Sequence, residues 1–221
     1  MKHAAVLWDM DGTLVDTEPY WMEAEFDLAE RYGGHWTHEH GLALVGNDLL
    51  ESGRYILRHM FDPGSPGSRL TPEEVVELLL DGVVARVEHA VPWRPGARAL
   101  LAELLAAGVP CALVTMSYQR FVDPILAELP DGAFAEIVTG DRVSQGKPHP
   151  EPYLKAAAGL GLAPETCLAI EDSNTGATSA EAAGCTVLVV ECHVPVAPGE
   201  RRVFRDSLEG LTPADLLTLA P

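Results

Sequence analysis

Two aspartates stand two positions apart near the start of the chain, directly after a short apolar run. Asp9 and Asp11 follow residues 4–8 and are themselves followed by Gly12. Glycine allows the chain to curl, so that both carboxylates can converge. One ionised carboxylate can then act as a nucleophile while its neighbour handles protons, because like charges push two pKa values apart. A solvated acidic turn would show the same pattern, so these residues alone leave both interpretations open.

Two further segments contain groups that suit a phosphate. Thr115, Met116 and Ser117 follow a second apolar run and precede a predicted helix, where hydroxyl and free backbone N–H groups can hold a phosphate oxygen. Lys147 lies between a glycine and a proline and is one of only three lysines in the chain, which makes it a candidate fixed cation. Taken singly, the hydroxyls could only cap a helix and the lysine could lie on the surface.

Adjacent acids follow a third apolar run. Glu171 and Asp172 come directly after residues 167–170. Carboxylate oxygens at this spacing suit a hard cation such as Mg²⁺, which prefers oxygen ligands. An acidic turn is the alternative when this pair is considered alone.

Short apolar runs alternate with helical stretches along most of the chain, which predicts an α/β fold with a parallel sheet covered by helices. The expected strands are 4–8, 110–115, 137–139, 167–170 and 186–190, and the expected helices are 97–107, 118–129, 151–160 and 175–183. Ligands of open α/β sheets bind beyond the carboxyl ends of the strands. The acidic, hydroxyl and lysine groups lie at such ends, so we expect them to meet.

Residues 17–91 differ from the rest because no convincing strand occurs there. Helices are expected at 20–32, 48–60 and 72–89, the last beginning with a capping box from Thr71 to Glu74. We therefore predict a core formed by residues 1–16 and 92–221 and a helical cap formed by residues 17–91, with hinges near 16–19 and 92–95. The tail from residue 191 is expected to wrap the edge of the core and to end in a short helix at 213–219.

Composition narrows the class of partner. The formal net charge of −18 disfavours nucleic acid and anionic membrane surfaces, and no apolar run reaches eighteen residues. No signal peptide is visible, and the four cysteines form no CxxC pair. These observations predict a cytoplasmic protein with reduced thiols, whose oligomeric state stays open. A phosphate site in such an acidic chain requires locally concentrated positive charge.

The motifs occur in a diagnostic order, each at the end of a predicted strand. They are Asp9-x-Asp11-Gly12-Thr13, then Thr115, then Gly146-Lys147-Pro148, then Glu171-Asp172. This order closely resembles the haloacid dehalogenase-like hydrolase superfamily over essentially the whole chain. The helical block after the first motif is similar to the subfamily of phosphoglycolate phosphatases, sugar phosphatases and β-phosphoglucomutases. The resemblance implies a Rossmann-like core with an inserted cap.

The resemblance also implies roles for the motif residues. Asp9 would attack phosphorus to give an aspartyl-phosphate, and Asp11 would protonate the leaving oxygen and later deprotonate water. Thr115, Met116, Ser117 and Lys147 would hold the phosphate oxygens together with the two aspartates. Mg²⁺ would be held by Asp9, the Asp11 carbonyl and Asp172, with help from Glu171.

The cap would select the leaving group of a small phosphorylated metabolite. Candidate specificity residues are Glu18, Tyr20, Trp21, Gly46, Asn47 and Arg54. Packing between cap helices is the alternative role for these side chains. One sequence does not name the substrate.

Comparison within the resemblance favours a phosphatase. Dehalogenases lack the second aspartate, and phosphonoacetaldehyde hydrolases need a cap lysine, whereas no lysine occurs between Lys2 and Lys147. A β-phosphoglucomutase carries a cap histidine where this chain has Trp21, a cap lysine, and an arginine three residues after a glycine, where Gly46 is followed by Asn-Asp-Leu. The mutase stays an alternative, as does a non-catalytic binding member of the fold.

Overall fold

Six parallel strands form the sheet at the centre of the molecule, in the order β3-β2-β1-β4-β5-β6. The computed structural model describes residues 2–45 and 47–221. The strands are β1 (Ala5–Trp8), β2 (Cys111–Val114), β3 (Glu136–Val138), β4 (Cys167–Glu171), β5 (Thr186–Val189) and β6 (Arg202–Phe204). The predicted α/β class with a parallel sheet is therefore confirmed.

Both faces of the sheet are covered, which is why its inner strands are continuous apolar runs. Val6 and Trp8 of β1 pack with α5 (Ala97–Ala106) and α6 (Gln119–Leu126), and α9 (Pro213–Thr218) adds Leu216 to the same cluster. Ala5 and Leu7 point to the other face, into a cluster with α7 (Glu151–Gly159) and α8 (Asn174–Ala183). This alternation follows the two-residue period of a strand.

The sixth strand was missed at the sequence level. Residues 191–221 were expected only to wrap the core edge and end in a helix, but Arg202–Phe204 pairs with β5. The strand has three residues, none of them buried, so it lacks the apolar run that marks the inner strands. The expected terminal helix is present as α9.

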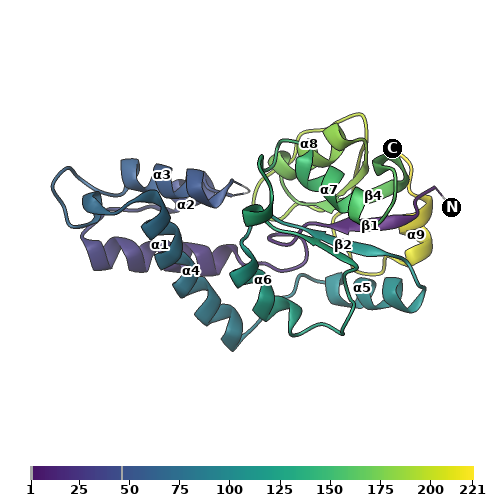
Figure 1. Ribbon diagram of the computed structural model, residues 1–221, viewed down its shortest axis with the longest axis horizontal. Coiled ribbons are helices and arrows are strands. Elements are labelled where there is room, and N and C mark those ends of the chain that lie inside the picture. Colours follow the sequence, from purple (N-terminus) through teal and green to yellow (C-terminus); the bar gives the residue numbers. More distant parts are fainter. Residues whose placement is uncertain (1, 46) are drawn as a thin grey trace.

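The segment after the first motif is helical wherever the structure describes it. It contains α1 (Glu18–Tyr32), α2 (His38–Leu42), α3 (Leu49–His59) and α4 (Pro72–His89), with a single 3-10 turn at Gly67–Arg69. Figure 1 shows these helices gathered beyond the carboxyl end of the sheet, far from both chain termini. The short helix α2 was not predicted. The capping box at Thr71 and Glu74 is present at the start of α4.

Side chains connect the helical segment to the helices of the sheet. The ring of Trp21 in α1 meets Phe121 of α6 edge to face, with ring centroids 5.4 Å apart. Arg120 of α6 forms ion pairs with Glu77 and Asp81 of α4. These contacts hold α1 and α4 above the sheet end where the motif residues lie.

Two simple expectations from composition can also be compared with the structure. Within residues 2–45 and 47–221, no helix has the length and apolar character to cross a membrane. All four cysteines are free thiols, of which Cys111, Cys167 and Cys185 are buried.

The packing of β2 generates a stability prediction. Leu113 is fully buried at the centre of the sheet, so Leu113→Ala should lower the free energy of unfolding by about 2–5 kcal/mol. Leu154 on α7 is 43% exposed, so Leu154→Ala should change it by about 0.5 kcal/mol or less. Urea titration of both variants provides the measurement, and equal losses in the two would contradict this account of the core.

Candidate active site

The turn after β1 brings two acidic motifs together. The N–H of Asp9 bonds to the carbonyl of Ile170 on β4, which aligns the end of β1 with Asp172. Gly12 has φ +85°, and a Cβ atom there would lie 2.0 Å from Oδ2 of Asp172. A side chain at residue 12 would therefore be strained and would displace that carboxylate. The glycine is needed both for the curl and for the approach of Asp172.

Lys147 lies at the centre of a buried charge network. Its Nζ atom lies 2.7 Å from Oδ1 of Asp9 and 2.7 Å from Oε1 of Glu171, and it donates to the carbonyl of Val114 at 2.9 Å. The hydroxyl of Tyr153 donates to the same Glu171 oxygen at 2.5 Å. Lys147 is thus held by groups from three different strand ends and from α7. It is the local positive charge that the acidic chain requires.

Burial and the neighbouring charges act on the pKa of Lys147 in opposite directions. Burial alone would lower the pKa, but the charges of Asp9 and Glu171 outweigh it and raise the pKa above its usual value, so the ammonium stays charged. Burial raises the pKa of Glu171 to about 7, and the charge of Asp9 adds to this effect. The network therefore keeps its cation.

Three hydroxyl groups surround the carboxylate of Asp11. Thr17 donates to Oδ1 at 2.5 Å, while Ser117 and Thr115 donate to Oδ2 at 2.8 and 3.2 Å. Burial raises the pKa of Asp11, and the nearby Asp9 adds to this, while the hydroxyl donors, Thr17 foremost, oppose it. A carboxyl group whose pKa is raised can hold a proton and transfer it.

Free backbone N–H groups were expected at residues 115–117 to hold a phosphate oxygen, but the structure differs. The N–H of Ser117 is already bonded to Oγ1 of Thr115 at 3.0 Å, and both hydroxyls point at Asp11. Met116 lines the same pocket, and its sulfur accepts the N–H of Lys147. In this arrangement the two hydroxyls orient Asp11 and also line the pocket.

The carboxylates of Asp9, Glu171 and Asp172 fit a hard divalent cation. Their ligand oxygens lie within 4.8 Å of one another, and Oδ2 of Asp9 is buried with no hydrogen-bond partner among the described residues. Burial, together with the charges of Asp9 and Glu171, raises the pKa of Asp172. A divalent cation would offset this crowding of like charges, and an all-oxygen donor set suits Mg²⁺.

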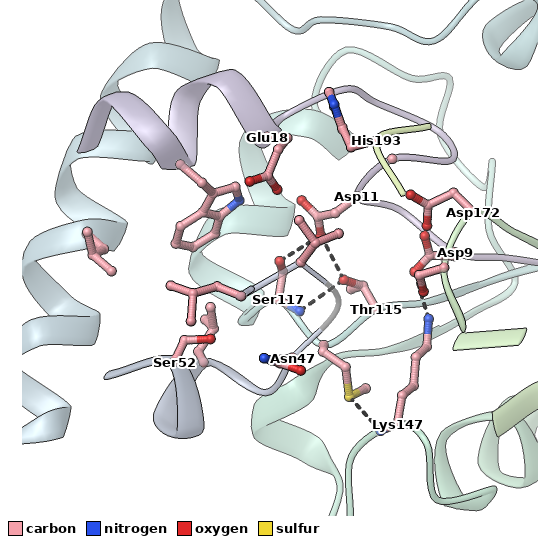
Figure 2. Close-up of a pocket in the computed structure, with 18 of the residues that line it drawn as sticks. Asp9, Asp11, Glu18, Asn47, Ser52, Thr115, Ser117, Lys147, Asp172 and His193 are labelled. Carbon is pink, nitrogen blue, oxygen red and sulfur yellow. Dashed lines mark hydrogen bonds and ion pairs between the residues drawn. The ribbon is translucent and has the colours of Figure 1, made fainter. Parts of the chain in front are cut away.

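The helical segment closes the other side of the pocket. Figure 2 shows Glu18, Asn47 and Ser52 on the side facing Asp11 and Thr115, with Asp9, Asp172 and Lys147 beyond. Trp21 also lines the pocket. Burial, together with the charges of Glu25, Asp11 and Asp16, raises the pKa of Glu18 to about 8.

Two predicted specificity residues lie elsewhere. Tyr20 donates its hydroxyl to the carbonyl of Ala90, and Arg54 pairs with Glu51 on the exposed side of α3. Neither lines the pocket. Gly46 is outside the described residues.

Several pocket residues were missed at the sequence level. Glu25 of α1 and Ser52 of α3 line the pocket, as does His193, which follows β5 and pairs with Asp16 at 2.7 Å. Thr17 contributes through its bond to Asp11. A helical wheel places Glu25 one turn beyond Trp21, which is the only local signal that could have identified it.

A family model described as haloacid dehalogenase-like hydrolase matches residues 3–184. The chain belongs to this family of hydrolases. Hexitol phosphatase A of Escherichia coli is 37% identical over 86% of this chain and 84% of its own length. Hexitol phosphatase B of the same organism is 31% identical, over 96% of each chain.

A solved structure has the same architecture. CbbY from Rhodobacter sphaeroides, in complex with xylulose 1,5-bisphosphate, matches with a TM-score of 0.82 and 28% identity over 97% of this chain and 99% of its own. The predicted family, subfamily and enzyme class, a phosphoric monoester hydrolase, are confirmed by these relatives and the family model.

The buried network generates a prediction for Lys147. Lys147→Met leaves two buried carboxylates without their cation, so the free energy of unfolding should fall by about 3–5 kcal/mol. Lys155→Met is the matched control, because Lys155 lies on the surface, where it pairs with Glu151 and donates to the carbonyl of Arg142. Chemical denaturation of both variants tests this. Similar stabilities would show that Lys147 is not essential to the network.

A second prediction concerns Glu25, whose pKa burial raises to about 7 despite the hydrogen bond from Trp36. Between pH 4.5 and 7 the folded protein holds a proton on Glu25 that the unfolded chain has lost, so this group lowers stability as pH rises. Glu25→Gln should therefore gain stability relative to wild type across that interval and reach a plateau above it. Urea titrations at several pH values measure the difference, with the exposed Glu30→Gln on the same helix as control. Parallel stability curves for wild type and Glu25→Gln would contradict it.

Proposed function

We propose that the chain is a Mg²⁺-dependent phosphatase that hydrolyses a small phosphorylated metabolite, a sugar phosphate or a similar compound, through an aspartyl-phosphate on Asp9. One observation is central to this proposal. Asp9 has one oxygen held by Lys147 and the other buried without a hydrogen bond, at the wall of the pocket. An oriented carboxylate with an unsatisfied oxygen is suited to attack an electrophile.

In the first step a carboxylate oxygen of Asp9 attacks phosphorus. The P–O bond to the leaving alcohol breaks as the Asp9–P bond forms, and Asp11 donates a proton to the departing oxygen. The raised pKa of Asp11 favours the protonated form that this step needs. Thr17, Thr115 and Ser117 orient Asp11 through its two oxygens.

In the second step water replaces the alcohol. Asp11, now ionised, takes a proton from the water as its oxygen attacks phosphorus, and the bond to Asp9 breaks to release phosphate. Lys147, Thr115, Ser117 and the backbone near Met116 border the position of the phosphate oxygens. Their positive charge and donor groups would stabilise the negative charge of the transferring group.

Asp9, Asp172 and the Asp11 backbone carbonyl would hold Mg²⁺, with Glu171 behind them. When bound, the ion supplies positive charge that offsets repulsion between the substrate and Asp9. Glu171 is fully buried and already bonded to Lys147 and Tyr153. These bonds support a role in orienting the cation-binding groups more than direct ligation.

The helical segment completes this proposal as a cap. Residues 17–91 would form the cap, and residues 1–16 and 92–221 the core, so that Glu18, Trp21 and Asn47 face the leaving group. A closed cap excludes bulk water from the phosphorylated aspartate. The hexitol phosphatases among the relatives favour a sugar or sugar-alcohol phosphate as substrate.

The mutase stays the second candidate. The β-phosphoglucomutase structure from Clostridium difficile shares the fold at 23% identity, which supports only the architecture. The pocket holds Trp21 and Glu18 at its cap side and no described lysine or arginine except Lys147. The absence of a basic cap group in the described lining favours water over a phosphorylated sugar as acceptor.

Removal of the nucleophile is the direct test. Asp9→Asn should lower kcat for phosphate release by a factor on the order of 10³ or more, because the amide cannot form the acyl phosphate. The exposed Asp131→Asn serves as the matched control and should retain wild-type kcat. Release of phosphate from p-nitrophenyl phosphate and from a panel of sugar phosphates gives the readout. Equal turnover by wild type and Asp9→Asn would exclude this mechanism.

Removal of the metal is a separate prediction. EDTA should abolish phosphate release, and added Mg²⁺ should restore it, because the carboxylate cluster otherwise repels the substrate. The same assay with β-glucose 1-phosphate decides the alternative. Formation of glucose 6-phosphate without free phosphate would identify a mutase, and activity that persists in EDTA would exclude the metal requirement.

A further inference from the structure

The charge of the pocket lining is strongly unbalanced. Five carboxylates line it, namely Asp9, Asp11, Glu18, Glu25 and Asp172, against a single described lysine or arginine, Lys147. Lys147 is already paired with Asp9 and Glu171. Asp9, Asp11 and Asp172 belong to the phosphate end, so Glu18 and Glu25 are the acids that the proposed reaction does not use.

Glu25 is a buried acid, and one of its two carboxylate oxygens has no described hydrogen-bond partner. It is 3% exposed, and its Oε2 atom accepts the indole N–H of Trp36 at 2.8 Å. The other oxygen has no hydrogen-bond partner among the described residues, although the residue lines the pocket. A carboxylate oxygen that lines a pocket without a protein partner gains a hydrogen bond when a ligand or water supplies a donor.

Glu18 is a second carboxylate of this lining, and it lies on the side of the pocket that faces Asp11. It lies at the start of α1 between the cap and Asp11, and no described residue forms a hydrogen bond or ion pair with its carboxylate (Figure 2). Glu18, Glu25 and Asp11 all line the same pocket, so the three acids share one space. Asn47 and Ser52 add neutral polar groups to that lining.

We propose that Glu18 and Glu25 bind the hydroxyl groups of an uncharged, polyhydroxylated leaving group, and that this acidic lining selects against substrates that carry a second anionic group. The inference rests on the proposed phosphatase function and specifies its substrate class. Glu25 is thereby a specificity-determining residue on the part of the pocket lining that α1 contributes. The fitting ligand is a sugar-alcohol monophosphate or a chemically similar compound.

Hydroxyl groups match these acids in either protonation state. An ionised carboxylate accepts hydrogen bonds from two hydroxyls, and a protonated one both donates and accepts. Burial raises the pKa of Glu25 to about 7 and that of Glu18 to about 8, so both forms occur near neutral pH. Apolar neighbours such as Leu44 and Leu79 can contact the carbon chain between the hydroxyls.

Apart from Lys147, the described lining has no lysine or arginine to pair with a second anionic group, and its one histidine, His193, is held by Asp16. Such an anionic group would be repelled by ionised acids and would gain no charge neutralisation from protonated ones. Arg54, the only cationic side chain among the predicted specificity residues, lies on the exposed side of α3 and pairs with Glu51. The CbbY structure contains a bisphosphate. We therefore expect this chain to differ from CbbY in the charge of the preferred substrate.

Three substrates with a common six-carbon chain test the inference. Glucitol 6-phosphate carries neutral hydroxyls, 6-phosphogluconate replaces the terminal CH₂OH with a carboxylate, and hexyl phosphate has no hydroxyls. Wild-type protein with Mg²⁺ should show a kcat/KM for glucitol 6-phosphate at least about tenfold above that for each of the others, since one unpaired polar or charged group costs that much or more. A preference for 6-phosphogluconate, or equal values for all three, would overturn the inference.

Variants then assign the preference to Glu25. Glu25→Leu should reduce the ratio of glucitol 6-phosphate to hexyl phosphate at least about tenfold, because an apolar side chain cannot bind a hydroxyl. Glu25→Gln keeps a hydrogen-bonding group without the charge and should raise kcat/KM for 6-phosphogluconate relative to glucitol 6-phosphate. Glu30→Gln, exposed on the same helix, should leave both ratios at wild-type values. Unchanged ratios in both Glu25 variants would show that this side chain does not select the substrate.

Two outcomes separate this inference from the proposed function. If wild type hydrolyses none of the three compounds and not p-nitrophenyl phosphate, the phosphatase proposal fails. If it hydrolyses them without preference, the phosphatase stands and only the substrate class is wrong. Circular dichroism identifies a Glu25→Leu variant that does not fold, in which case the wild-type preference and Glu25→Gln still decide.

Discussion

The ammonium group of Lys147, buried between Asp9 and Glu171, is the interaction on which the rest of the site depends. Two buried carboxylates beside each other repel strongly, and neither could stay ionised without a cation between them. The same lysine also bonds to the end of β2, so one side chain joins the ends of three strands and the loop before α7. The compensation of the buried negative charge and the alignment of the strands therefore depend on the same side chain.

Two glycines allow the acidic side chains of the site to come close to the backbone. The absence of a side chain at Gly12 lets Asp172 approach the first motif, and the absence of one at Gly176 leaves room for Glu171, whose oxygens would lie 2.0 Å from a Cβ atom there. Asp11 is separated from this cluster by a different environment of three hydroxyl donors. Two aspartates two positions apart thus have distinct surroundings, which is what a nucleophile and a proton-transfer group require.

In the proposed reaction the helical segment would add specificity to a centre formed mainly by loops at the strand ends, to which Thr17 contributes a hydroxyl. The phosphate end of the pocket has a cation and hydroxyl donors, whereas the end formed by α1 and α3 has apolar side chains and two acids without cations. This polarity gives the pocket a direction, with the phosphate at one end and a neutral alcohol at the other. It would also explain how a chain of net charge −18 accepts an anionic substrate, because Lys147, the one lysine or arginine in the described lining, lies at the end proposed for the phosphate.

The sequence by itself determined the fold class and the reaction centre. The motif residues occur at strand ends, and parallel strands bring their carboxyl ends to one edge, so Asp9, Asp11, Thr115, Lys147 and Asp172 had to meet. The residues that line the other end of the pocket, proposed for the leaving group, could be identified only from the tertiary structure. Tyr20 and Arg54 lie outside the pocket while Glu25, Ser52 and His193 line it, because the direction of a helix face depends on how α1 and α3 pack. The exposed strand β6 also lacked a local signal, since its residues form a strand only by pairing with β5. Local patterns specify what a strand end carries, but the position of one helix over another is set by packing between residues distant in the chain.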